Sequence, residues 1–231
     1  MIHPDIQAML VRERSATLLA AAAAYRRGRQ ARAAAAPAAA APRAASATAR
    51  RAAASGTAKR RQVVLRDGSA VLIRPVRGTD ARLLADGFAR LSERSRRLRF
   101  LGRKTTLTDA DLHYYADVDH HDHEALGALD HVRGGGVGIA RYVRDRKNPA
   151  AAEIAVTIVD DWQGRGLGTE LLARLSERAR EEGIRRFTAV VADGNAAATG
   201  LLLSCGASLV HRGSGIVEYE IDLAGTRSQA G

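Results

Sequence analysis

The chain contains a single cysteine, Cys205, and it has no long hydrophobic run near its N-terminus. One thiol cannot form a disulfide within the chain, which is typical of a reducing compartment, and we therefore expect a cytoplasmic protein. The longest apolar run near the N-terminus is Ala16–Tyr25, far shorter than the roughly 20 residues of a membrane-spanning helix. Because arginines precede this alanine-rich run, a cleaved signal or an organelle transit peptide stays an alternative.

Acidic residues are scarce in the first 61 positions, which contain 12 Lys and Arg but only 2 Asp and Glu. Residues 62–231 are nearly balanced, with 24 and 23, so the formal net charge of +11 belongs almost entirely to the front of the chain. The high isoelectric point therefore does not indicate that the remainder binds nucleic acid. Nucleic acid is a possible partner of the basic tail alone, where no pattern of aromatic residues accompanies the cations and simple solubility is the plainer interpretation.

Large apolar side chains are missing from residues 31–61, which are rich in alanine and arginine. Such a segment cannot bury a core that offsets the entropy of ordering the chain, so we predict a disordered linker. The segment before it is rich in helix formers, and Pro4 and Asp5 suit the first turn of a helix. We therefore expect a tail over residues 1–61, helical from about 4 to 30, and a short disordered C-terminus over residues 225–231.

A folded domain is expected over residues 62–224, where apolar positions follow strand and helix periods. Asp67-Gly68 lies between two β-rich runs and predicts a hairpin. Thr79 and Thr108 precede helical patterns and are predicted N-caps, with a further short helix between them over residues 92–101. Three strand-like runs joined by short connections then predict an antiparallel meander: Glu124–Asp130, Val137–Arg144 and Glu153–Val159.

The last third of the domain alternates between helix and strand patterns. A helix is predicted from Gly166 to Gly183, because leucines recur at helical spacing and Gly183 suits the position after a helix C-terminus. The elements that follow are a strand at Phe187–Ala192, a helix at Asn195–Ser204, and closing strands at Ser208–Val210 and Ile216–Leu223. The predicted fold class is therefore mixed α/β (α+β), with enough residues to bury a core.

Between the third strand of the meander and the long helix lies the sequence WQGRGLG, Trp162 to Gly168. The first N–H groups of a helix have no intrahelical partner and lie at the positive end of its dipole, so a glycine-rich turn here predicts an anion site. The glycine spacing differs from that of the dinucleotide motif, and the preceding strands form a meander rather than a βαβ unit. No Gly-Lys-Ser/Thr sequence is present, which excludes a P-loop.

This turn resembles that of a known family. Gln163 to Gly168 matches the Q/R-x-x-G-x-G/A signature of the GNAT N-acetyltransferase superfamily, and the order of elements over residues 63–223 is similar. The resemblance implies a GNAT fold, with a central, mostly antiparallel sheet and flanking helices, and acetyl-CoA as the co-substrate. It also implies which residues bind acetyl-CoA: Ile158, Val159 and Asp160 at the pantetheine arm, Gln163, Gly164, Arg165, Gly166, Leu167, Gly168 and Thr169 at the pyrophosphate, and Asn195 at the pantetheine arm.

Four longer stretches are similar to the bacterial protein-lysine acetyltransferases of the actinobacterial type: RDGSAVLIRPVRGTD, LSERSRRLRFL, DVDHHDHEALGALD and AEIAVTIVDDWQGRGLG. This resemblance implies a protein lysine as the acceptor. Those relatives often carry a regulatory domain that binds a cyclic nucleotide or an amino acid. Residues 1–61 are too poor in apolar side chains to fold as either domain, so control by those ligands is not expected.

Glu153 is the candidate general base. A lysine ammonium, with a pKa of about 10.4, must lose a proton before its nitrogen can attack a thioester. Glu153 begins the central strand, where the resembling enzymes place their catalytic glutamate, and an exposed structural glutamate is the alternative. Many family members place a tyrosine acid where this chain has Leu202, so we expect the thiolate to leave without that acid. Cys205 is a conceivable acyl carrier, but a small buried residue is the commoner role of such a cysteine.

The segment DVDHHDHEAL contains His120, His121 and His123 among carboxylates, a composition that could bind zinc. On a strand only His121 and His123 would share a face, and no distant Cys/His pair completes a ligand set, so we expect no metal. The acidic residues of this segment would instead attract a cationic lysine, and His120 is a second candidate for proton transfer.

Three functions are compatible with the sequence. The leading prediction is an acetyl-CoA-dependent protein lysine N-acetyltransferase. A small-amine or antibiotic acetyltransferase is the second, since an open groove for a protein and a closed pocket for a small amine have no distinct sequence signature. A non-catalytic acyl-CoA sensor or a tail-driven nucleic-acid-binding protein is the third.

Overall fold

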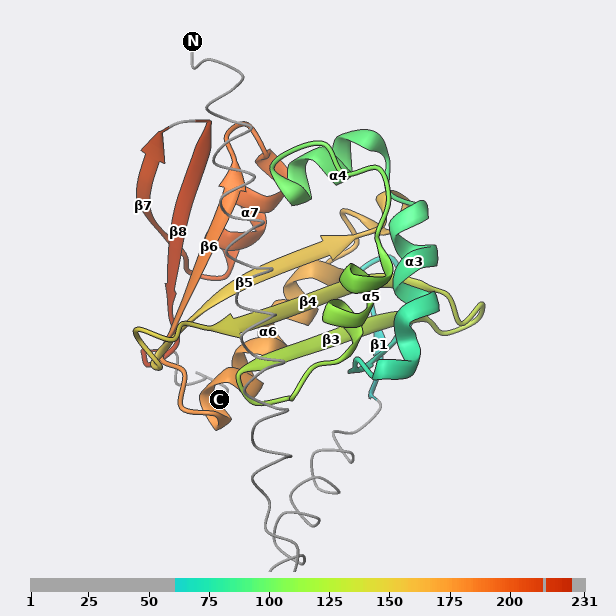
Figure 1. Cartoon of the computed structure of the whole chain (residues 1–231), viewed down its shortest axis with the longest axis horizontal. Helices are drawn as coiled ribbons and strands as arrows, with labels where there is room; N and C mark the ends of the chain where they lie inside the picture. Colours follow the sequence, from blue (N-terminus) through green and yellow to red (C-terminus); the bar gives the residue numbers. More distant parts are fainter. Residues whose placement is uncertain (1–60, 214, 226–231) are drawn as a thin grey trace, which may run out of the picture. The chain divides into compact units, whose positions relative to one another are not determined.

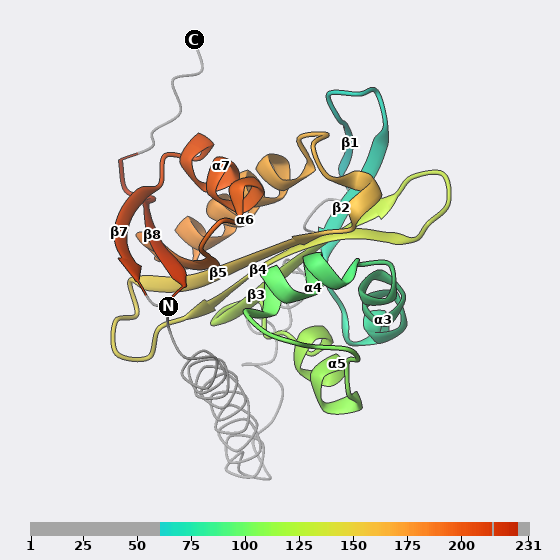
Figure 2. The same ribbon diagram turned by 90° about the horizontal axis from the view of Figure 1, so that it is seen from above.

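The computed structural model describes residues 61–213 and 215–225 (Figure 1). The helix predicted over residues 4–30, the linker after it and residues 226–231 lie outside the described residues. The described part is one sheet with helices on both of its faces (Figure 2). This arrangement confirms the predicted mixed α/β fold.

Eight strands form one sheet in the order β1-β2-β3-β4-β5-β6-β8-β7. The strands are β1 Arg61–Val64, β2 Ala70–Pro75, β3 His123–Asp130, β4 Gly136–Arg144, β5 Ala151–Ile158, β6 Arg186–Ala192, β7 Ser208–Gly213 and β8 Ile216–Asp222. All neighbours are antiparallel except β5 and β6, which are parallel. The predicted hairpin at Asp67-Gly68 and the antiparallel meander of β3, β4 and β5 are thus confirmed.

Helices cover the sheet in two groups. They are the 3-10 helices η1 Gly78–Asp80 and η2 Asp160–Trp162, and the α-helices α3 Ala81–Ala89, α4 Glu93–Phe100, α5 Asp109–Ala116, α6 Leu167–Glu181 and α7 Ala196–Ser204. Helices α3, α4 and α5 lie on one face of the sheet, and α6 and α7 lie on the other (Figure 2). Over the described residues, no helix is both long and apolar enough to cross a membrane.

Helix α6 buries one apolar stripe against the sheet, because its leucines recur every three or four residues. The buried side chains of the stripe are Leu167, Leu171, Leu172, Leu175 and Ala179. They join one core with strand residues such as Val137 and Phe187. Burying each leucine contributes about 2 kcal/mol to folding, so this helix anchors the turn that precedes it.

Side chains close the N-termini of three helices. Ser92 Oγ accepts a hydrogen bond from the Ser95 amide at the start of α4, Thr108 is the N-cap of α5 as predicted and forms a capping box there, and Asn195 caps α7. Helix α6 differs, because its N-cap is Gly166 and no side chain accepts a hydrogen bond from its first turn. The first N–H groups of α6 therefore stay available to another partner.

The prediction that Thr79 is an N-cap is wrong. Thr79 lies inside η1, and Asp80 is the N-cap residue of α3. The Asp80 carboxylate accepts hydrogen bonds from the Arg74 guanidinium at 2.6 and 2.8 Å and from the Arg77 amide at 2.8 Å. This ion pair with strand β2 decides where the helix begins, and a local sequence pattern does not contain it.

Candidate functional site

Strands β5 and β6 separate at Glu153 and open a wedge in the middle of the sheet. Their parallel pairing covers only residues 151–153 of β5, and its last pair joins Glu153 to Thr188. Residues 154–158 stay paired with β4, but their other edge pairs with no strand of the described residues. This edge offers backbone N–H and C=O groups to an extended ligand, as an edge strand offers them to a peptide.

The open edge of β5 leads along the chain to the turn before α6. Gly164 and Gly166 have φ of 75° and 88°, a left-handed conformation that costs other residues roughly 1–2 kcal/mol. Gly168 serves packing instead, because a Cβ there would lie 3.0 Å from Cδ2 of Leu201 on α7. The turn thus presents the backbone of Leu167 to Thr169, at the positive end of the α6 dipole, as a site suited to phosphate.

Gln163 and Asp160, both predicted to bind the cofactor, also hold the rim of the wedge together. Gln163 Nε2 donates to the carbonyl of Ile158 at 3.0 Å. Asp160 accepts hydrogen bonds from the Ser92 amide at 2.9 Å, the Ser92 hydroxyl at 2.7 Å and the Ser95 hydroxyl at 2.8 Å. Burial raises the pKa of Asp160, but the hydrogen bonds from Ser92 and Ser95 outweigh burial and lower it. These contacts fix α4 to the end of β5.

Arg165 is bound to protein groups on two sides. Its Nη1 donates to the Asp67 carboxylate at 2.9 Å, its Nη2 donates to the Asp161 carbonyl, and its guanidinium lies 4.8 Å from the centre of the Trp162 ring. Arg165 therefore ties the glycine turn to the β1–β2 hairpin, and its role at a pyrophosphate stays a prediction.

Arg66 is a cation beside the turn that sequence reasoning missed. A Cβ on Gly166 would lie 3.4 Å from Cδ and Nε of Arg66. The Arg66 side chain has no hydrogen bond or ion pair with the part of the chain that the structure describes. It is therefore free to meet an anion at the start of α6. Because the turn between β1 and β2 and the start of α6 are far apart in sequence, no local signal reveals this proximity.

Helix α7 lies beside α6 and places three residues considered above. Asn195 Oδ1 accepts a hydrogen bond from the Ala198 amide at 3.2 Å, so its side chain caps α7. Leu202 is buried, and the position where many relatives have a tyrosine contributes packing here. Burial raises the pKa of the Cys205 thiol, the direction that disfavours a thiolate nucleophile.

The histidines of the segment before β3 have separate partners. His120 Nδ1 lies 2.7 Å from Oε1 of Glu124, which is 1% exposed and also pairs with Arg178 of α6. His121 hydrogen-bonds Glu182. Glu124 is thus enclosed on the α6 side of the sheet and has no surface with which to attract a lysine. No hydrogen bond joins His120 to the candidate base in the described residues, and none of their His, Cys, Asp and Glu groups could hold a metal.

Glu153 faces the side of the sheet that α5 covers. The strand register places His123, Val143 and Glu153 in one row across β3, β4 and β5, and residues directly opposite share a face. The His123 ring packs on Tyr114 of α5, with ring centres 5.1 Å apart. The pKa of Tyr114 is raised chiefly by burial, and Glu153 is among the neighbours that raise it further.

The Glu153 carboxylate is exposed at the vertex of the wedge. Among residues 61–213 and 215–225 it has no hydrogen bond and no ion pair. A carboxylate that the protein leaves unpaired can accept a proton from a substrate. The arrangement therefore combines an unpaired carboxylate, an open strand edge and a turn suited to phosphate.

Comparisons with known proteins agree with this geometry. Residues 90–207 match the family described as Acetyltransferase (GNAT) family. Acetyltransferase Pat of Mycolicibacterium smegmatis is 33% identical over 161 residues, which are 70% of this chain and 48% of that protein. Acetyltransferase PA5475 of Pseudomonas aeruginosa is 38% identical over 144 residues, which are 62% of this chain and 77% of that protein.

The structural comparison extends the same relationship. The crystal structure of the GNAT domain of S. lividans PAT superposes with a TM-score of 0.66 at 32% identity, covering 70% of this chain and 96% of that one. This chain spans about half the length of Acetyltransferase Pat. The family match covers the wedge, the glycine turn and helix α7, and the chain therefore belongs to the GNAT acetyltransferase family.

Proposed function

We propose that this chain transfers the acetyl group of acetyl-CoA to the amine of a protein lysine, with Glu153 as the general base. The observation that carries the proposal is the wedge, whose open edge begins at Glu153 and ends beside the N-terminus of α6. The parts of acetyl-CoA follow one another in the same order as the features of the wedge. Its pyrophosphate suits the positive helix end, its amide-bearing arm suits the strand edge, and its thioester comes to lie near the base.

The residues present fit such a ligand. The backbone of Gly166 to Thr169 would hold the pyrophosphate, with Arg66 as a neighbouring cation. The open edge at residues 154–158 spans about 17 Å at the rise of a strand, a length that an extended pantetheine arm can follow. Ile158 and Val159 would lie beside that arm.

In the proposed step the nitrogen of a lysine ammonium loses two protons, and the departing sulfur gains one. When bound, acetyl-CoA supplies the acetyl group as an activated thioester. Glu153 accepts a proton from the lysine ammonium, directly or through water, so that the neutral nitrogen can form the amide bond. Backbone N–H groups on the open edge of β5 are available to polarise the carbonyl. As the C–N bond forms and the C–S bond breaks, the nitrogen releases its second proton to solvent, and the departing sulfur takes a proton from solvent because Leu202 offers no acid.

The exposure of Glu153 supports a macromolecular acceptor. A base at the surface can be reached by a lysine side chain that projects from another protein. A base that served only small amines would be expected at the bottom of an enclosed pocket. We therefore favour a protein lysine over a small amine, in agreement with the resemblance of four sequence stretches to protein-lysine acetyltransferases.

The proposal is tested by mass spectrometry of a lysate incubated with the protein and isotope-labelled acetyl-CoA. Label on specific protein lysines, lost in the Glu153→Gln variant and kept in Glu177→Gln, is the expected result. Glu177 is a suitable control because it is an exposed carboxylate on α6. Label confined to small amines would favour the second function, and tight acetyl-CoA binding without any transfer would favour an acyl-CoA sensor.

A further inference from the structure

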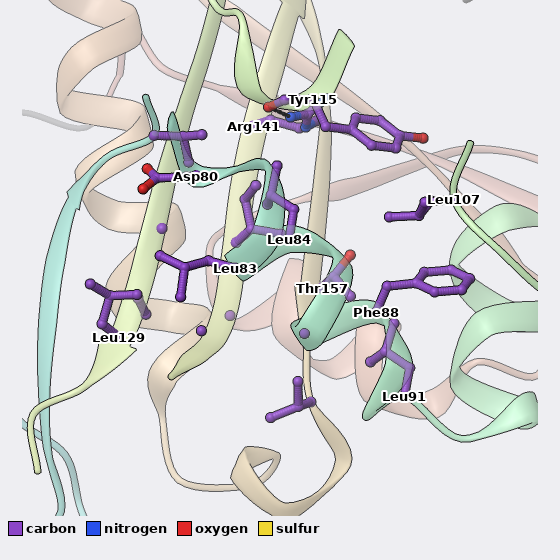
Figure 3. Close-up of a pocket in the computed structure, with 18 of the residues that line it drawn as sticks. Asp80, Leu83, Leu84, Phe88, Leu91, Leu107, Tyr115, Leu129, Arg141 and Thr157 are labelled. Atoms are coloured by element: carbon purple, nitrogen blue, oxygen red, sulfur yellow. Dashed lines mark hydrogen bonds between the residues drawn. The ribbon is translucent and has the colours of Figure 1, made fainter. Parts of the chain in front are cut away.

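A cavity lies between strands β2–β5 and helices α3, α4 and α5 (Figure 3). It has a volume of about 100 Å³ and is partly open to solvent. Its walls are mostly apolar side chains such as Leu83, Leu84 and Phe88. It lies on the same face of the sheet as Glu153, because Thr157 lines it and alternate residues of a strand share a face.

Arg141 of β4 lines this cavity as a buried cation without a carboxylate partner. Arg141 is only 5% exposed. Its Nη2 donates a hydrogen bond to the Tyr115 carbonyl at 2.8 Å, whereas its Nη1 has no hydrogen-bond partner among the described residues. Burial lowers the pKa of Arg141 to about 10 and the neighbouring Arg99 lowers it too, whereas Tyr114 and Tyr115, whose ring centres lie 5.7 and 4.4 Å from the guanidinium, raise it. The net lowering is expected of a buried charge that lacks a carboxylate counter-ion.

Two other arginines, Arg74 and Arg99, line the cavity and differ in whether a carboxylate pairs with them. Arg74 is neutralised, because its guanidinium holds both oxygens of Asp80. Arg99 of α4 uses only Nε, which donates to Thr157 Oγ1 at 2.9 Å. Its two Nη atoms make no hydrogen bond to the part of the chain that the structure describes. The cavity therefore has two guanidiniums, those of Arg141 and Arg99, that no protein carboxylate compensates.

We propose that this cavity binds a small carboxylic acid with an apolar body, whose carboxylate is held by Arg141 and Arg99 and whose body contacts the leucine and phenylalanine walls. A carboxylate between the two guanidiniums would form charge-assisted hydrogen bonds and compensate an otherwise unpaired buried cation. The carboxylate can belong to a free acid or to an acidic side chain of an acceptor protein. Binding at this cavity requires neither acetyl-CoA nor Glu153, so the inference goes beyond the proposed function.

The test is isothermal titration calorimetry on the full chain without acetyl-CoA. The probe is 4-methylpentanoate, and its uncharged counterpart is 4-methylpentanamide, which has nearly the same shape. We expect the acid to bind and the amide to bind at least about tenfold more weakly, because a hydrogen bond to a charged group is stronger than a neutral one. Equal affinities for the two probes, or no measurable binding of the acid, would overturn the proposal.

Variants locate the binding site. Arg141→Gln and Arg99→Gln should each weaken binding of the acid about tenfold or more, whereas Arg141→Lys should retain part of the affinity because it keeps the charge. Arg94→Gln, an exposed arginine on α4, is the matched control. Arg99 is only partly buried, so its variant keeps the test valid if Arg141→Gln fails to fold. Unchanged affinity in folded Arg99→Gln overturns the proposal.

A second arm separates the two sources of the carboxylate. Lysine peptides that carry either a glutamate or a glutamine near the lysine are titrated in the same way. If the glutamate peptide binds more tightly than the glutamine peptide, and Arg99→Gln abolishes the difference, the carboxylate belongs to the acceptor protein. If the two peptides bind equally while the free acid binds tightly, the carboxylate belongs to a free ligand. These titrations measure binding of the acid and no acetyl transfer, and Glu153→Gln should bind the acid normally. The cavity proposal can therefore be judged even if the proposed acetyltransferase activity is not found.

Discussion

Asp160 accepts hydrogen bonds from both the backbone amide and the hydroxyl of Ser92, 68 residues earlier in the chain. The contact joins the N-terminus of α4 to the end of β5. The strand that carries Glu153 and the helix that carries Arg99 are therefore anchored at one point. Substitutions at this anchor are expected to act on both the wedge and the cavity.

Replacing Asp160 with alanine should lower the free energy of unfolding by about 1 kcal/mol, because three hydrogen bonds are lost at a site that solvent partly screens. The folded pKa of Asp160 lies below its usual value. Its contribution is thus present above the unfolded pKa of about 3.9 and is lost as the pH falls through the folded pKa. Urea unfolding at pH 7 and at about pH 3 measures the loss of stability and its dependence on pH. The control is Asp86→Ala, a variant of an exposed aspartate. An equal loss at both pH values would contradict the ionic role.

Replacing Glu153 with glutamine should lower kcat by about 10²–10⁴-fold, because the ammonium of the acceptor keeps its proton. The affinity for acetyl-CoA should stay unchanged, since a proton acceptor is not needed for binding. Steady-state kinetics with a lysine peptide and calorimetry with acetyl-CoA give the two quantities. Near-normal turnover in this variant would remove Glu153 from the mechanism.

Gly166 and Gly183 provide a matched pair, because both have positive φ, 88° and 79°, at opposite ends of α6. An alanine at either position should cost roughly 1–2 kcal/mol of stability through backbone strain. Only Gly166→Ala should also weaken acetyl-CoA binding, because it alone shifts the first turn of the helix. Thermal unfolding and calorimetry on both variants measure the difference. A similar loss of affinity in Gly183→Ala would show that the effect is one of general stability.

Replacing Arg66 with glutamine should weaken acetyl-CoA binding about fivefold and make it less sensitive to salt, because a cation near the phosphate site is lost. Arg82→Gln, an exposed cation on α3, should change neither quantity. Calorimetry at 50 mM and 300 mM NaCl, roughly a twofold change in Debye length, supplies the comparison. Identical salt dependence in Arg66→Gln and the unchanged protein would place Arg66 away from the bound phosphates.

His123 should make the protein less stable in mild acid. Burial lowers its pKa to about 2, and Nε2 has no hydrogen-bond partner among the described residues. The unfolded chain, with a pKa of about 6.5, binds the proton more readily, so stability rises with pH between about 2 and 6.5. Between pH 7 and pH 5 the free energy of unfolding should fall by about 2 kcal/mol through this group. Urea unfolding should show a smaller fall in His123→Phe than in His131→Phe, a variant of an exposed histidine.

Local patterns predicted most of the elements. The hairpin at Asp67-Gly68, the strands of the meander, the leucine stripe of α6 and the helix that ends before Gly183 each depend on residues close in sequence. The glycines of the turn were also informative, because positive φ is a local requirement. The residue pattern of the turn predicts only a site for an anion, and the family resemblance implies that this anion is the pyrophosphate of acetyl-CoA.

Long-range partners explain what sequence reasoning missed. The start of α3 depends on the ion pair between Arg74 and Asp80, which lie on different elements, and the local pattern alone predicts Thr79 as the N-cap. Glu124 is one of the carboxylates expected to attract a lysine, but it is 1% exposed and pairs with Arg178 of α6, a contact between distant parts of the chain. The missing counter-ion of Arg141 has no sequence signal at all, because it is a property of everything packed around one side chain.

Helix α6 begins at a glycine and has no side chain to complete its first turn. Under the proposed function, a bound pyrophosphate takes the place of that missing side chain, and the co-substrate becomes part of the folded structure. Thermodynamic linkage then adds about 2.7 kcal/mol to stability when acetyl-CoA is a hundredfold above its Kd. The survival of this protein against proteolysis would therefore follow the supply of acetyl-CoA, and its abundance would carry metabolic information apart from any reaction that it catalyses.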